Sequence, residues 1–118
     1  DMTAEAANPR IFTLSEAEQL LGTVHAVTEE AVREAEQISE DLDRLSSDDP
    51  TRAARLQALE TVVHDWTARM EALGIVVKGL WLVDFDNGEG YYCWKYPEPA
   101  IRHYHGYDEG FAGRMKIV

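Results

Sequence analysis

The chain has a single cysteine, Cys93, and no long apolar stretch. One thiol cannot form an internal disulfide, which is typical of proteins in a reducing compartment. No run of residues approaches the roughly 20 apolar residues that a membrane-spanning helix needs. The first ten residues also lack the basic start and apolar core of a secretory signal peptide. Together these absences favour a cytoplasmic protein that does not act at a membrane.

Lysine is missing from the first 74 of the 118 residues. That part carries 6 Arg against 16 Asp and Glu, whereas residues 75–118 carry 5 basic and 6 acidic side chains. Most of the net charge of −11 therefore belongs to the N-terminal part. Because an acidic surface repels phosphate backbones and anionic lipids, we expect no nucleic acid partner and no membrane partner.

Two N-terminal stretches carry apolar or small residues at alternating spacings of three and four, which is the pattern of a coiled-coil seam. Thr13 and Glu16 have the spacing of a capping box and open a predicted helix over residues 13–47. Asp49 suits a helix start and opens a second predicted helix over residues 49–74. Since only a short turn separates them, we expect a long antiparallel hairpin of two helices, similar to a coiled coil.

The apolar stripe of this hairpin is wide near its open end and narrow near its turn, and Thr28 is its one polar interruption. We expect the wide end to pack against the segment that follows and the narrow end to project. A hairpin this long cannot bury both sides of its seam alone. We therefore predict a homodimer through the helical seams, with a further protein partner as a possibility.

The segment after Gly74 is rich in β-branched and aromatic residues, and 9 of the 11 aromatic residues of the chain lie within residues 81–111. This composition predicts a β segment over residues 75–105, with a bulge or bend at Gly79. Asn87-Gly88 is a strong hairpin signal between its second and third apolar runs.

The β segment predicts a small antiparallel sheet of two to three strands. Residues 106–118 contain three glycines and predict a C-terminal loop, and residues 1–10 predict a flexible tail. The expected fold is thus a single α+β domain over residues 1–118, in which a helical hairpin precedes the sheet.

Two histidines alternate along the last expected strand and could bind one metal ion. His103 and His105 would share a face, and Cys93 could join them from the neighbouring strand. The pair supplies only two ligands, and a nearby carboxylate would have to complete the set. The alternative is that one histidine is buried and hydrogen-bonded while the other faces solvent.

Asp84 lies between apolar residues of an expected strand. An unpaired carboxylate there would cost several kcal/mol, so we expect a partner such as Arg102 or Arg114. Such a pair would either fasten the C-terminal segment to the sheet or form part of an acid–base site. Arg114 follows two glycines and could alternatively hold an anion.

Seven short segments of this region resemble a prokaryotic family known as domain-of-unknown-function family 2203. They are Gly74-Ile-Val-Val-Lys78, Leu82-Val-Asp-Phe85, Tyr92-Cys-Trp94, Glu98-Pro99, Ile101-Arg102, His105 and Gly110-Phe-Ala-Gly-Arg114. Phe12-Thr-Leu14, Glu16-Ala17 and Leu20-Leu21 resemble the N-terminal signature of the family, so the similarity spans roughly residues 11–114. It implies no activity. It implies instead that the family pattern singles out Asp84, Cys93, Trp94, Glu98, Arg102, His105 and Arg114.

The chain departs from that pattern at four positions. Asp86 stands where the family usually has proline, Pro97 where it has glycine, and Tyr104 where it has tryptophan. His103 has no counterpart in the pattern, which argues against the pair of histidines as a metal site and leaves His105 as the family-level candidate.

Two classes of function follow from these patterns. The first is a non-enzymatic, oligomeric interaction or scaffold protein, because the seams are long and no catalytic set is complete. The alternative is a small-molecule or metal-binding protein, or an enzyme, with its site in the β segment. The candidate ligand-binding residues are Asp84, Glu98, Arg102, His105 and Arg114, the candidate metal ligands are Cys93, His103 and His105, and no cofactor is strongly implied.

The predicted homodimer can be measured directly. Light scattering on the purified chain is expected to give twice the mass of one chain, because the two seams expose more apolar surface than one hairpin can cover. A strict monomer at all accessible concentrations would contradict this expectation.

Overall fold

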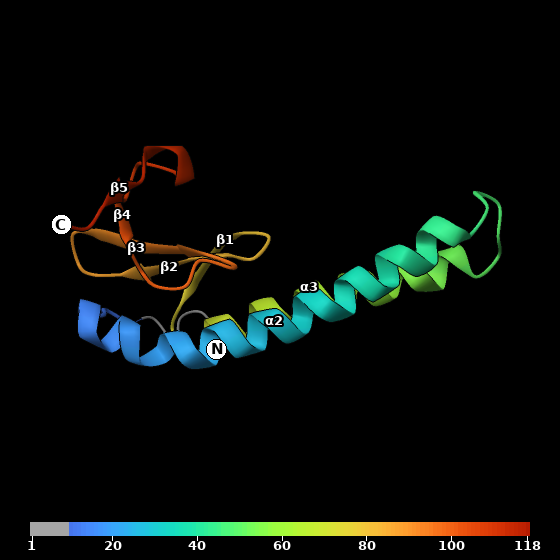
Figure 1. Ribbon diagram of the computed structural model, residues 1–118, viewed down its shortest axis with the longest axis horizontal. Coiled ribbons are helices and arrows are strands. Elements are labelled where there is room, and N and C mark those ends of the chain that lie inside the picture. Colours follow the sequence, from blue (N-terminus) through green and yellow to red (C-terminus); the bar gives the residue numbers. More distant parts are fainter. Residues whose placement is uncertain (1–9) are drawn as a thin grey trace, which may run out of the picture.

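The computed structural model describes residues 10–118, so the flexible tail expected over residues 1–10 lies outside the described residues except for Arg10. Two long helices come first and a five-stranded antiparallel sheet follows (Figure 1). The α+β class expected from the sequence is confirmed.

The two helices lie side by side and are joined at the end farthest from the sheet (Figure 1). Helix α2 spans Leu14–Arg44 and helix α3 spans Arg52–Ala72, so both are slightly shorter than the predicted 13–47 and 49–74. Within the described part of the chain, no helix combines the length and the apolar character needed to cross a membrane.

Local hydrogen bonds explain where the helices begin and end. Thr13 Oγ1 accepts from the Glu16 backbone N–H at 3.1 Å, and Glu16 Oε1 accepts from the Thr13 N–H at 2.9 Å, which completes the capping box. Asp49 Oδ1 accepts from the Thr51 N–H at 2.8 Å just before α3. Gly74 follows α3 with φ of 83°, the left-handed conformation typical of a glycine that ends a helix.

The sheet has five strands, so the prediction of two to three strands was wrong. The strands are β1 (Val76–Gly79), β2 (Leu82–Asp86), β3 (Gly90–Lys95), β4 (His103–Gly106) and β5 (Met115–Lys116). They lie in the sheet in chain order, and each is antiparallel to its neighbours. The sheet is therefore a simple meander.

Two features explain why the sequence pattern did not predict all five strands. β1 and β2 are joined by Leu80 and Trp81 alone, without the usual turn residues, and Trp81 adopts φ of 60°. Its ring packs edge-to-face against Trp66 with 5.0 Å between the ring centroids, which helps to offset the strained turn. β5 has only two residues and lies within residues 106–118, the predicted loop, which also contains a 3-10 helix (Phe111–Gly113).

The two faces of the sheet differ in chemistry. Val83 and Phe85 of β2 and Trp94 of β3 are fully buried on the face that the helices cover. Alternation along the strands turns Asp84 and Cys93 to the opposite face. The core that joins helices and sheet comprises Phe12, Ala17, Val24, Ala31, Trp66, Met70, Ile75, Val83, Phe85, Trp94 and Ile101.

Thr28, the polar interruption of the first seam, is buried between the helices. Its Oγ1 accepts a hydrogen bond of 2.8 Å from Trp66 Nε1, and the Trp66 residue is only 2% exposed. The threonine therefore satisfies a buried indole N–H that no apolar residue could satisfy.

Replacing Thr28 by valine is expected to lower the free energy of unfolding by about 1–3 kcal/mol, because the shape is kept while the indole N–H loses its acceptor. Thr28→Ser is the matched control, since it keeps the hydroxyl. Chemical denaturation should rank the valine variant below the serine variant, and the reverse order would contradict a role for this hydrogen bond.

Candidate functional site

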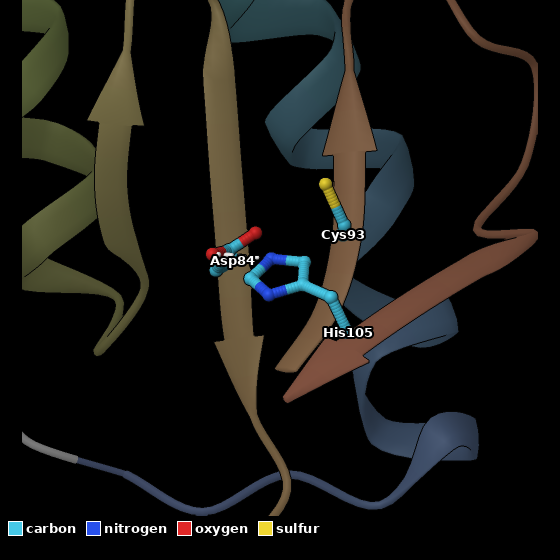
Figure 2. A group of neighbouring side chains, drawn as sticks. All are labelled: Asp84, Cys93 and His105. Atoms are coloured by element: carbon cyan, nitrogen blue, oxygen red, sulfur yellow. Dashed lines mark ion pairs between the residues drawn. The ribbon is translucent and has the colours of Figure 1, made fainter. Parts of the chain in front are cut away.

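Three buried side chains from neighbouring strands meet on the face of the sheet that points away from the helices. Asp84 lies on β2, Cys93 on β3 and His105 on β4, and each residue is at most 2% exposed. Figure 2 shows the three side chains projecting from the same side of the sheet, with α2 behind it. One potential ligand atom from each residue lies within 4.8 Å of those of the other two.

Strand register explains why these residues come together. Asp84 pairs directly with Cys93 in the β2–β3 ladder, and Tyr91 pairs with His105 in the β3–β4 ladder. His105 therefore lies one diagonal step from Cys93 on the same face. Because the register depends on several turns, the sequence pattern alone could not predict this meeting.

Gly90 allows β3 and β4 to approach closely at this point. A Cβ atom on Gly90 would lie 2.6 Å from the carbonyl oxygen of His105, which is closer than side chains tolerate. Any larger residue would displace β4, so Gly90 is a positioning residue for the His105 ring.

The His105 ring is held between a backbone carbonyl and a carboxylate. Its Nδ1 lies 2.9 Å from the carbonyl oxygen of Gly106, and its Nε2 lies 2.9 Å from Asp84 Oδ2. Since a carbonyl oxygen can only accept, Nδ1 donates its proton there, and Nε2 is the nitrogen that faces Asp84. A histidine fastened through Nδ1 in this way is typical of metal ligands that bind through Nε2.

The Asp84 carboxylate is buried but poorly satisfied. Neither of its oxygens accepts a well-aligned hydrogen bond from the described residues, although His105 Nε2 is within ion-pair distance. Lys78 Nζ lies 3.9 Å from Oδ2, and the Lys78 side chain is 36% exposed. Because a buried carboxylate without full hydrogen bonding is costly, its presence here suggests a role other than stability.

The Cys93 thiol is protonated in this environment. Burial is the largest cause and the negative charge of Asp84 adds to it, so the pKa of Cys93 is raised to about 12, and Arg114 opposes this only in part. A thiol with such a pKa is not an activated nucleophile. The arrangement of Cys93 and His105 therefore does not favour cysteine catalysis.

Glu98 and Arg114 form a second pair at the edge of this group. Arg114 Nη1 lies 2.8 Å from Glu98 Oε2 and 4.0 Å from Cys93 Sγ. Glu98 also accepts a hydrogen bond of 2.9 Å from the Lys95 backbone N–H. Arg114 thus takes Glu98 as its partner, whereas Asp84 was expected to pair with Arg102 or Arg114.

The remaining candidates lie outside the group of three. Arg102 is exposed, and its contact with the C-terminal segment is a 2.8 Å hydrogen bond from the Ile117 N–H to its backbone carbonyl. His103 faces Cys93 in the β3–β4 register, but its ring is not part of the group, and its Nδ1 is buried without a hydrogen-bond partner among residues 10–118. His103 and His105 therefore lie in different environments, and His105 belongs to the group of three whereas His103 does not.

A cavity of about 270 Å³ opens onto the group. The sequence pattern did not point to Lys78, which lies in the wall of this cavity, although the irregularity predicted at Gly79 was a signal for it. The cavity is lined by Lys78, Leu82, Asp84, Cys93, His105, Glu109, Gly110 and Phe111.

Comparison with curated proteins and with solved structures yields no match. Comparison with protein families does give a match. The model of the family described as "Uncharacterized conserved protein (DUF2203)" matches residues 10–117. The match covers both helices and all five strands, including the three strands that carry Asp84, Cys93 and His105. The chain belongs to the DUF2203 family of uncharacterized conserved proteins.

Proposed function

We propose that this protein binds a divalent transition metal ion of the zinc type through Asp84, Cys93 and His105. The observation that carries the proposal is the convergence of a carboxylate oxygen, a thiol sulfur and an imidazole nitrogen within 4.8 Å of one another. All three groups are buried, so their mutual approach is fixed by the sheet rather than by flexible surface side chains.

The chemistry of the three ligands supports this class of metal. Imidazole and thiolate suit zinc, cobalt and copper, whereas magnesium and calcium prefer sites made of oxygen atoms. His105 Nε2 and Asp84 Oδ2 already point at one another at 2.9 Å, and a metal ion between them would need only a small separation of the two groups.

A bound metal would also resolve the unfavourable electrostatics of the buried group. Asp84 accepts no well-aligned hydrogen bond from residues 10–118, and the pKa of Cys93 is raised to about 12 because its thiolate would be buried beside that carboxylate. A divalent cation compensates two negative ligands at once, and coordination drives the thiol proton off. The same burial that disfavours the free thiolate therefore favours its metal complex.

Three protein ligands leave one position of a tetrahedral ion open. Structural zinc sites normally use four protein ligands, whereas sites that bind an external molecule keep one position free. The cavity of about 270 Å³ borders the group and supports the second kind of site.

A second candidate is the oligomeric interaction or scaffold role expected from the sequence. It is supported by an apolar groove on the hairpin beside the β1–β2 turn, in which Leu80 is 55% exposed. A homodimer would cover this groove. A scaffold role does not explain why a carboxylate, a thiol and an imidazole are buried together on the face of the sheet that points away from the helices. Metal binding is therefore the better-supported function.

Cobalt titration tests the proposed site. Co²⁺ added to the metal-free chain is expected to bind in a 1:1 ratio and to give both ligand-field bands and a thiolate-to-cobalt charge-transfer band, because Cys93 becomes a ligand. Zn²⁺ should displace the cobalt. Absence of the charge-transfer band at saturating Co²⁺ would contradict the proposed ligand set.

Single substitutions identify the ligands. Cys93→Ser, His105→Gln and Asp84→Asn should each weaken Co²⁺ binding by at least about 100-fold, since each removes a direct ligand. His103→Gln is the matched control on the same strand and should leave the affinity unchanged. If His103→Gln alone abolishes binding, the alternating pair of histidines is the site. Circular dichroism and thermal unfolding separate lost ligands from lost fold.

A further inference from the structure

We infer that the open position of the proposed metal site receives a small organic molecule with a single carboxylate, and that Lys78 binds this carboxylate beside the metal. The inference rests on the proposed metal-binding function and adds the class of its ligand. Its basis is the placement of one cation, the charge of the group and the lining of the cavity.

Lys78 occupies an irregular position in the sheet. Val77 pairs with Val83 and Gly79 pairs with Leu82, so Lys78 is an extra residue in β1 without a partner in β2. Bulges of this kind are frequent beside functional sites, where they redirect a side chain. Here the Lys78 ammonium lies 3.9 Å from Asp84 Oδ2 at the wall of the cavity.

The ring of Tyr91, on β3, contacts the ammonium of Lys78. Lys78 Nζ lies 4.3 Å from the centroid of the Tyr91 ring, a cation–π distance. The Tyr91 ring also contacts His105, with 5.4 Å between the centroids. Tyr91 thereby contacts both the ammonium of Lys78 and the imidazole of the proposed metal ligand.

Metal binding would change the surroundings of Lys78. A divalent metal offsets the carboxylate of Asp84 and the thiolate of Cys93, so these groups together become neutral. Lys78, whose Nζ lies 3.9 Å from Asp84 Oδ2, then loses the attraction of a free carboxylate and becomes available to a carboxylate of the ligand. Arg114 does not share this role, because Glu98 engages it at 2.8 Å.

The cavity wall specifies more than a simple anion. Leu82 and Phe111 give it apolar surface, which suits a short carbon chain, and its volume of about 270 Å³ suits a small molecule. Glu109 also lines it, with its carboxylate bound to the Gly106 N–H at 2.7 Å. A second negative charge on the ligand would meet Glu109, so a monocarboxylate fits better than a dianion such as phosphate.

The cobalt-loaded chain provides the assay. Butyrate is expected to change the ligand-field bands of bound Co²⁺ saturably, whereas butyramide, a neutral molecule of the same shape, should not. Lys78→Gln should weaken butyrate binding by at least about tenfold, as for loss of a charge-assisted hydrogen bond, without weakening Co²⁺ binding. Lys95→Gln is the matched control, because Lys95 lies on β3 outside the cavity lining.

The outcomes separate this inference from the proposed function. If the thiolate-to-cobalt band is absent, both the proposed metal site and the proposed carboxylate ligand are overturned. With that band but no response to butyrate, the metal site stands and the carboxylate inference alone is overturned. Tighter binding of inorganic phosphate than of butyrate, or equal losses in the Lys78 and Lys95 variants, would likewise overturn it.

Discussion

The register of β3 between β2 and β4 is the constraint on which the rest of this structure depends. Successive side chains point to opposite faces, so Val83 and Trp94 enter the core only if Asp84 and Cys93 point away from it. A slip of one residue would exchange the two sets, exposing the core residues and burying a carboxylate against the helices. The apolar face that holds the sheet on the hairpin and the polar group on the other face are thus two results of one pairing.

The sequence predicted features that depend on neighbouring residues and missed those that depend on distant ones. The capping box at Thr13, the helix end at Gly74 and the strands beside Asn87 are local, and the structure contains all of them. β5 was missed because two residues carry no readable alternation. Asp84 was expected to pair with Arg102 or Arg114, whereas His105 Nε2 lies 2.9 Å from its Oδ2, since only the three-strand register decides which side chains become neighbours.

The buried polar group sits on a fold whose stability does not require it. Helices and sheet are joined by a continuous apolar core that includes Trp66, Phe85 and Trp94, whereas the carboxylate of Asp84 lies across the sheet from that core. A buried charge of this kind contributes little or unfavourably to folding, and an apolar residue of similar volume would serve the sheet better. The apolar core therefore stabilises a fold that carries a group unfavourable to the free energy of folding.

The predicted homodimer would involve the helices and leave this face of the sheet free.

The meander order of the strands bears on how the protein folds. Every neighbour in the sheet is also the next strand along the chain, and Asp84 and His105 are separated by only 21 positions, from 84 to 105. Closing such short loops costs little chain entropy. The one demanding step is docking the sheet on the hairpin, where the Phe12 N–H bonds to the Asp86 carbonyl at 2.7 Å. The polar group depends only on the pairing of three consecutive strands, so its side chains come together when those strands pair.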